Sequence, residues 1–222
     1  MKTSTGSKDL DEFLGGYEDD IITMIYGPSG TAKSTLCLMA TASLVKQNKR
    51  VIYIDTGSEF SIDRLKQLIG KDYEKTIENI LVLKINSFEE QKNKINELSK
   101  LVKQNNIHLI VLDNLSFFYR LELQNKDPKI INKEIAMQLK QLRGINKTEN
   151  IPILITNQVY DDLQTKGVKM VGGNFIQNFS KCIIELKKEN KRKIIIKKHR
   201  SLPEQELTFK ITNEGVIKDS HL

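Results

Sequence analysis

The feature that most constrains the fold is a glycine-rich segment between an apolar run and an amphipathic run. Residues 21–26 are apolar, and residues 33–48 carry apolar side chains at three- and four-residue spacings. The segment between them consists of Gly27, Pro28, Ser29, Gly30, Thr31, Ala32, Lys33 and Ser34. A glycine-rich loop with Lys and Ser that follows a strand and opens a helix is a phosphate-binding loop. The alternative, a chance turn, is disfavoured by this context.

The residue types of the loop match a triphosphate and its metal ion. Backbone N–H groups of the loop and of the helix N-terminus point at the phosphates. Lys33 supplies a point charge to the β- and γ-oxygens, Ser34 ligates Mg²⁺, and Thr35 lies directly behind. The sequence therefore predicts that residues 27–35 bind ATP and Mg²⁺.

One residue of the loop departs from the usual pattern. Ala32 stands before the lysine, where glycine is usual. If Ala32 is already helical, its methyl group costs little and adds helix propensity.

Apolar runs alternate with amphipathic stretches along most of the chain. The short apolar runs are 21–26, 51–54, 80–83, 107–112 and 151–155. The amphipathic stretches are 33–48, 61–69, 88–105 and 130–147. Strands covered by helices on both faces have this pattern, which predicts an α/β fold with a mainly parallel central sheet.

The pattern changes after Gly173. Strand-like runs at 182–186, 193–196, 206–211 and 216–217 are separated by turn signals. They predict an antiparallel extension at one edge of the sheet. Because prolines 28, 128, 152 and 203 are scattered and no linker interrupts the chain, we expect a single domain, 1–222.

Composition narrows the class of protein. Residues 1–11 are polar, and no run approaches 18 apolar residues, so we expect a soluble cytoplasmic protein without a membrane segment. Cys37 and Cys182 lack metal-site spacing and are expected to be buried, reduced thiols. The net charge of +7 favours a polyanionic partner such as nucleic acid.

Asp113 is the candidate second ligand of the metal ion. It ends the apolar run 109–112, so its carboxylate should emerge at the carboxyl end of a central strand, where α/β sheets bind ligands. We expect it to hold Mg²⁺ through a water molecule. A lone Asp after a strand can instead cap a helix or form a turn, and Asn114 is a candidate cap.

Several segments together resemble the RecA/RadA recombinase superfamily. They are 4–6, 9–16, the phosphate loop, 53–56, Phe60 with 63–65, 112–114, 119–120, 151–152, 156–158, 198–200 and 202–204. The likeness spans nearly the whole chain and is closest to the short archaeal members. It implies a RecA-like P-loop NTPase core without a separate amino-terminal DNA-binding domain, and a role in DNA recombination and repair.

The main departure from the family pattern lies after the second predicted strand. The family usually reads Asp-Thr-Glu-Gly, whereas this chain reads Asp55, Thr56, Gly57, Ser58, Glu59. The resemblance therefore places the family's water-activating glutamate on Gly57, which has no side chain to orient water. Glu59 is the local substitute, or a solvated surface residue. We expect ATP to bind normally and turn over slowly.

The resemblance also implies two segments that line the path of DNA. By position they are 117–132 and 159–175. In the first, aromatic side chains and Arg120 offer stacking faces and a phosphate contact to single-stranded DNA, or the two Phe residues form a buried cluster. In the second, Lys166 and Lys169 lie among glycines, which suits sequence-independent contact with a backbone or an ordinary surface loop.

Two further sites follow from the resemblance. Gln158 is expected to sense the γ-phosphate and to transmit its presence to segment 159–175, a role for which its amide can donate and accept. Lys198, His199 and Arg200 match the region that approaches ATP across a subunit interface. They end a stretch, 181–200, that is rich in Lys and Arg and is either this interface or a solvated hairpin.

The leading hypothesis is an ATP-dependent DNA-binding accessory protein of homologous recombination. Its expected partners are single-stranded DNA bound without sequence preference and a recombinase or other recombination protein, and a homo-oligomer is left open. The alternatives are a filament-forming strand-exchange ATPase that uses Glu59, and a regulatory ATPase of the same superfamily with a protein partner.

Overall fold

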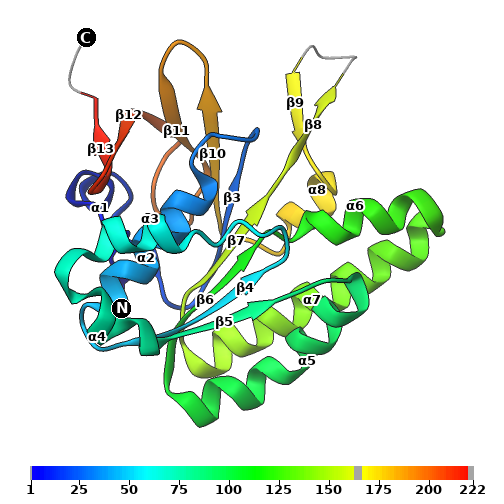
Figure 1. The fold of residues 1–222 in the computed structure, drawn as a ribbon. Coiled ribbons are helices and arrows are strands. Elements are labelled where there is room, and N and C mark those ends of the chain that lie inside the picture. The colour runs from blue at the N-terminus through cyan, green and yellow to red at the C-terminus, as the bar shows by residue number, and fades with distance from the viewer. Residues whose placement is uncertain (1, 163–166, 220–222) are drawn as a thin grey trace.

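A nine-stranded sheet runs through the centre of the molecule (Figure 1). The computed structural model describes residues 2–162 and 167–219. The strands of this sheet are β3 (Ile22–Tyr26), β4 (Arg50–Asp55), β5 (Ile80–Lys84), β6 (Ile107–Asp113), β7 (Ile153–Asn157), β10 (Cys182–Lys188), β11 (Arg192–Lys198), β12 (Gln205–Thr212) and β13 (Gly215–Lys218). Two short antiparallel pairs are separate from it, β1 (Lys2–Thr3) with β2 (Tyr17–Glu18) and β8 (Val159–Asp162) with β9 (Gly167–Met170).

The order of strands in the large sheet is β13-β12-β11-β10-β3-β7-β6-β4-β5. The strands from β10 to β5 pair in parallel, and β10 to β13 pair antiparallel. This arrangement confirms the predicted α/β fold with a mainly parallel sheet and an antiparallel carboxyl-terminal edge.

Helices cover both faces of the parallel part of the sheet (Figure 1). They are α1 (Lys8–Leu14), α2 (Lys33–Val45), α3 (Ile62–Ile69), α4 (Tyr73–Thr76), α5 (Phe88–Asn105), α6 (Ser116–Asn125), α7 (Pro128–Glu149) and α8 (Gly173–Gln177), with 3-10 turns η1 (Gly70–Asp72) and η2 (Ile77–Asn79). Ser61, Ser87 and Asp127 cap three of these helices by accepting backbone hydrogen bonds. None of the helices in the described part of the chain is long and apolar enough to cross a membrane.

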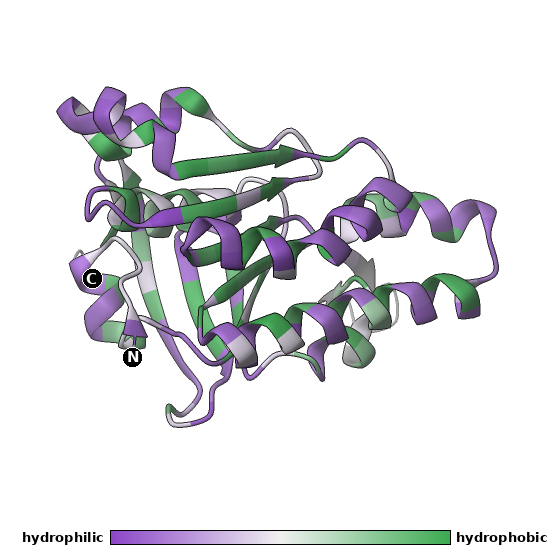
Figure 2. Ribbon diagram, turned by 90° about the horizontal axis from the view of Figure 1, so that it is seen from below, coloured by the Kyte–Doolittle hydropathy of each residue, from purple (hydrophilic) through white to green (hydrophobic). Residues whose placement is uncertain are grey.

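Two apolar cores lie on the two faces of the sheet. One packs α1, α2 and α3 against the sheet and includes Cys37 and Cys182, which are buried free thiols as predicted. The other packs α5, α6 and α7 against the opposite face. Figure 2 shows the strands as mostly hydrophobic and the helices as hydrophobic on part of their surface only. The inner parallel strands β3, β4, β6 and β7 are therefore buried on both sides, as their continuous apolar runs predicted, whereas the edge strand β5 is only partly buried.

The expectation of a loop over 117–132 is wrong. These residues form α6, a short connection and the first turn of α7. Phe118 and Tyr119 are buried in the core, and the Tyr119 hydroxyl donates to Asn132 Oδ1 at 2.6 Å. Phe117 is 37% exposed, so only one of the two Phe residues is buried. The apolar residues of this segment have helical spacing. The expectation of a loop came from the family resemblance, which was followed instead of that spacing.

Candidate nucleotide-binding site

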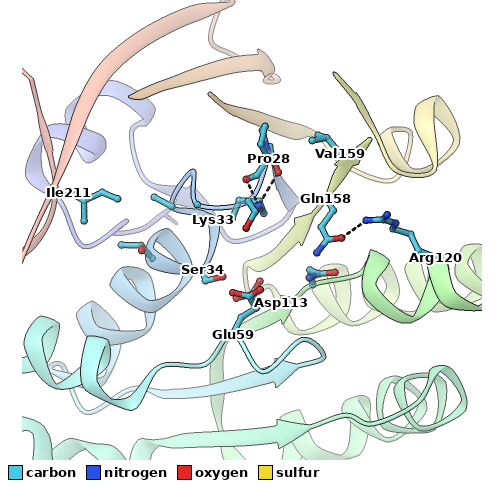
Figure 3. Close-up of a pocket in the computed structure, with 15 residues that line it drawn as sticks. Pro28, Lys33, Ser34, Glu59, Asp113, Arg120, Gln158, Val159 and Ile211 are labelled. Atoms are coloured by element: carbon cyan, nitrogen blue, oxygen red, sulfur yellow. Dashed lines mark hydrogen bonds between the residues drawn. The ribbon is translucent and has the colours of Figure 1, made fainter. Parts of the chain in front are cut away.

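A cavity of about 460 Å³ lies at the carboxyl ends of β3, β6 and β7 (Figure 3). It is lined by Gly27, Pro28, Ser29, Gly30, Ala32, Lys33, Ser34, Thr35, Glu59, Asp113, Asn114, Arg120, Gln158, Val159 and Ile211. The carboxyl ends of parallel strands are where open α/β sheets bind ligands. The structure therefore brings the predicted phosphate loop, Asp113, Glu59 and Gln158 together around one cavity.

At Gly27 the loop backbone approaches β10 too closely for any side chain. A Cβ atom on Gly27, whose φ is 155°, would lie 2.3 Å from the backbone oxygen of Leu186. The Thr31 side chain is buried, and its hydroxyl donates to the Pro28 carbonyl at 2.8 Å. Thr31 thus stabilises the loop from within and does not face the cavity, unlike its neighbours.

Lys33 folds its ammonium group over the loop. Nζ donates to the carbonyl oxygens of Gly27 at 2.9 Å and Pro28 at 2.8 Å (Figure 3). Burial lowers the pKa of Lys33, and the nearby carboxylates of Asp113 and Glu59 oppose that shift. Because the cation is partly desolvated, it is suited to attract an anion in the cavity.

Helix α2 begins at the cavity without a side-chain cap. Its N-cap is Ala32, which makes no side-chain cap hydrogen bond because a methyl group cannot accept one. The first-turn N–H groups of a helix attract anions when no side chain caps them. Ala32 has φ 90° and ψ 19°, so it is in the left-handed region and is not helical. The sequence analysis expected a small energetic cost for the Ala32 methyl group if this residue were helical. Because Ala32 is not helical, that expectation does not apply.

Replacing Ala32 with glycine is expected to stabilise the protein. A non-glycine residue in the left-handed region costs about 1–3 kcal/mol, part of which glycine loses again through unfolded-state entropy. We expect the free energy of unfolding to rise by about 1 kcal/mol, measured by urea unfolding. Ala42→Gly, within the same helix, is the matched control and should destabilise. A lower free energy of unfolding in Ala32→Gly would contradict the claim that the left-handed backbone of Ala32 is strained.

Asp113 is fixed by hydrogen bonds from two neighbouring strands. Its Oδ2 accepts from the Tyr53 hydroxyl at 2.6 Å, and its Oδ1 accepts from the Thr156 hydroxyl at 2.5 Å. The side chain is 1% exposed and still borders the cavity. A carboxylate has about four acceptor sites, so capacity remains for a water molecule. Asn114 also lines the cavity and is not the predicted helix cap, because α6 has Leu115 at its N-cap.

The Glu59 side chain lies beside the position that a side chain at residue 57 would occupy. A Cβ atom on Gly57 would lie 3.4 Å from Glu59 Cγ and 3.9 Å from Glu59 Oε1. The Glu59 backbone N–H donates to Asp55 Oδ1 at 2.9 Å. Burial and the Asp113 carboxylate raise the pKa of Glu59, against the effects of Lys33 and a Ser34 hydrogen bond. Glu59 therefore belongs to the cavity.

Gln158 connects the cavity to the β8–β9 hairpin. Its backbone oxygen accepts from Val171 N at 3.0 Å. The neighbouring Asn157 donates from Nδ2 to Val171 O at 2.9 Å. The segment predicted as the second loop is thus the hairpin followed by α8. Lys169 lies in β9 opposite Tyr160 in the strand register, and Lys166 lies outside the described residues.

Arg120 also lines the cavity. Its Nη1 donates to Gln158 Oε1 at 2.8 Å (Figure 3). Sequence reasoning assigned Arg120 to DNA because the family likeness placed it in a loop. The helical spacing of Ser116 and Arg120, four residues apart on α6, could have indicated that both face Gln158.

The candidate interface residues lie at the end of β11. Lys198 is exposed, and none of the three is among the described residues that line the cavity. Arg200 forms ion pairs with Glu18 and Asp20, which raise the pKa of its guanidinium. His199 Nδ1 faces the backbone N–H groups of Ser201 and Leu202, and burial lowers its pKa.

Acidic side chains partly neutralise the basic stretch 181–200. Strand pairing brings β12 alongside β11, so Lys193 pairs with Glu206 at 2.9 Å and Lys197 pairs with Glu204. Sequence analysis considered the stretch alone and missed these acids, which lie in β12 and directly before it.

Ile211 is a cavity residue that sequence reasoning missed. It comes from β12, is 37% exposed and lines the cavity from the side of that strand (Figure 3). It is distant from the loop in the sequence and has no local signal. The supporting contacts of Tyr53 and Thr156 were also missed, although both residues belong to segments that carried the family likeness.

Comparisons with known proteins agree with this fold. The family model described as Rad51 matches residues 1–220. The DNA repair and recombination protein RadB of Methanococcoides burtonii is 37% identical over 214 residues, which cover 94% of each chain. The protein of the same name from Methanocaldococcus jannaschii is 38% identical over 206 residues, which cover 91% of this chain and 95% of that protein.

A solved structure is similar over nearly the same range. The crystal structure of the RadB recombinase superposes with a TM-score of 0.81 at 32% sequence identity, and the match covers 96% of this chain and 98% of that chain. Family, relatives and structure agree with the likeness read from the motifs. The chain therefore belongs to the Rad51 family and, within it, to the RadB group.

Proposed function

We propose that this chain is an ATP-binding, DNA-binding accessory protein of homologous recombination and DNA repair that hydrolyses ATP slowly. The relatives are named DNA repair and recombination proteins. The observation that carries the proposal is a cavity with a phosphate loop, Lys33 and Asp113 in which position 57 has no side chain. Such a site can bind ATP as a structural ligand without turning it over rapidly.

The donor set of the cavity fits a triphosphate with Mg²⁺. The loop and the uncapped N-terminus of α2 offer backbone N–H groups, and Lys33 offers a cation. Ser34 and Asp113 are the oxygen ligands suited to Mg²⁺, which would neutralise phosphate charge. Mg²⁺ prefers oxygen ligands, so these two residues, together with phosphate oxygens and water, would be enough to hold it.

Slow hydrolysis is proposed because Glu59 is poorly placed to orient the water that attacks ATP. A general base must lie within hydrogen-bond reach of the water it activates. Glu59 reaches the cavity from two residues farther along, and its raised pKa reflects burial beside Asp113. Its backbone is tied to Asp55, so its carboxylate approaches from a displaced position. We therefore assign Glu59 weak water positioning.

DNA contact is proposed for segment 159–175 through Lys169, which lies in β9 of the β8–β9 hairpin, and through Lys166, which lies outside the described residues. The Val171 backbone N–H, directly after β9, donates to the Gln158 backbone oxygen, and the Asn157 side chain donates to the Val171 oxygen. A ligand that moves Gln158 would therefore move the hairpin. Lys contacts to phosphate carry no sequence information, which fits single-stranded DNA bound without sequence preference. Arg120 was a third candidate, but its guanidinium is bonded to Gln158.

Protein partners are proposed for the end of β11. Lys198 is exposed there, whereas Arg200 is paired with Glu18 and Asp20 of its own chain. For Arg200 to reach ATP of a second copy, these ion pairs would have to open. Lys198 is thus the better candidate contact to a second copy or to a recombinase, which are the partners that the proposal includes.

Steady-state ATP turnover with and without single-stranded DNA tests this proposal. We expect slow turnover that DNA changes little, together with retained ATP binding. Lys33→Ala serves as the control for contaminating ATPase. Rapid turnover that DNA stimulates and that Lys33→Ala abolishes would contradict the proposal in favour of a strand-exchange ATPase. Retained ATP binding without any DNA affinity would favour a regulatory ATPase with a protein partner.

A further inference from the structure

Arg120 is hydrogen-bonded to Gln158, a polar side chain that lines the phosphate cavity. It extends from α6, the helix that follows Asp113 and β6. The opposite side of this helix is anchored by the buried side chains of Phe118 and Tyr119. The Arg120 side chain therefore projects from a fixed helix toward the cavity that it lines.

Two contacts from α6 converge on Gln158. The Gln158 backbone N–H donates to Ser116 Oγ at 3.1 Å, and Arg120 Nη1 donates to Gln158 Oε1 at 2.8 Å. Ser116 and Arg120 are four residues apart, so they share one face of the helix. The backbone and the side-chain amide of Gln158 are thus both fixed by the same helix face.

The chemistry of arginine decides which end of the amide faces the cavity. A guanidinium only donates hydrogen bonds, so it can bind the amide oxygen of Gln158 and not the amide nitrogen. With the oxygen on Arg120, the –NH₂ group is directed to the other side. In Figure 3 the Gln158 amide lies between Arg120 and the phosphate loop. A donor is what a phosphate oxygen requires, whereas an amide oxygen would repel it.

We infer that Arg120 is a positioning residue of the nucleotide site, which orients Gln158 so that its amide –NH₂ group faces the terminal phosphate of ATP. The inference deepens the proposed function and rests on ATP binding in this cavity. ADP lacks the terminal phosphate, so Arg120 should affect the preference for ATP over ADP. It should not be needed for DNA affinity in the absence of nucleotide.

The test is the ratio of ADP to ATP dissociation constants, measured by calorimetry with Mg²⁺ for the full chain and for Arg120→Ala. We expect Arg120→Ala to lower the preference for ATP about tenfold, because a hydrogen bond to a charged group is lost. Arg120→Lys should restore part of it, since an ammonium also donates to the amide oxygen. Lys140→Ala, an exposed lysine on α7, is the matched control and should leave the ratio unchanged.

A double-mutant comparison separates positioning from a merely structural role. Gln158→Ala should lower the preference to the same extent, and the double variant should be no worse than either single one. Additive losses would overturn the inference. So would an unchanged ratio in Arg120→Ala, or a loss of nucleotide-free affinity for oligo-dT with the ratio preserved. Failure of the unmodified chain to bind ATP would instead contradict the proposed function itself.

Discussion

Replacing Lys33 with alanine is expected to lower the affinity for ATP with Mg²⁺ by about a hundredfold, because a charge-assisted contact to phosphate is lost. Lys33 is the cation nearest the loop carbonyls of Gly27 and Pro28, and burial has already removed part of its hydration. Direct binding measurements by calorimetry, with ATP and with ADP, would check this result. Both nucleotides should be affected, since the contact involves the β- as well as the γ-oxygens.

A control is needed because Lys33 also stabilises the loop in the absence of ligand. The alanine variant leaves two loop carbonyls without the ammonium group, so its free energy of unfolding should be measured alongside binding. Lys140→Ala removes an exposed lysine far from the loop and should bind ATP as the unmodified chain does. Unchanged ATP affinity in folded Lys33→Ala would contradict the assignment of this cavity to nucleotide.

The fold was predictable because the parallel strands are short and apolar, and because the helices between them have apolar residues at regular three- and four-residue spacings. β4, β6 and the antiparallel β10 to β13 lie within two residues of their predicted bounds. Residues 117–132 were assigned to a loop by family position alone, whereas their apolar spacing specifies a helix. Local periodicity is the physical cause of helix formation, so it was the better guide there.

The site was predictable where its residues are contiguous in sequence and less so where the fold assembles it. The phosphate loop and Asp113 follow directly from strand ends, and these positions border one cavity. The Arg120 contact depends on how α6 lies against the end of β7, and the presence of Ile211 depends on where β12 lies. The left-handed backbone of Ala32 was not predicted, because alanine rarely adopts it, although the glycine that is usual at this position was a signal for it.

Replacing Glu59 with alanine is expected to lower ATP turnover about tenfold while ATP affinity stays nearly constant, because a water-positioning carboxylate is lost. The pKa of Glu59 is raised, so turnover of the unmodified chain should fall with decreasing pH sooner than an ordinary Glu would dictate. The variant should lose that pH dependence. Glu97→Ala, which removes an exposed Glu on α5, is the matched control.

A carboxylate introduced at position 57 tests why hydrolysis is slow. It distinguishes the absence of a side chain at this position from a loop geometry that would misplace one. A Cβ atom there makes only ordinary contacts, and the nearest one is with Glu59, so Gly57→Glu combined with Glu59→Ala should fit the cavity. If the absent side chain limits hydrolysis, this double variant should turn over ATP faster than the unmodified chain, measured at saturating ATP. Turnover equal to that of Glu59→Ala alone would contradict this explanation. It would mean that the loop geometry keeps a carboxylate at position 57 from orienting the water, and that geometry is set by the Asp55 contact to the Glu59 backbone.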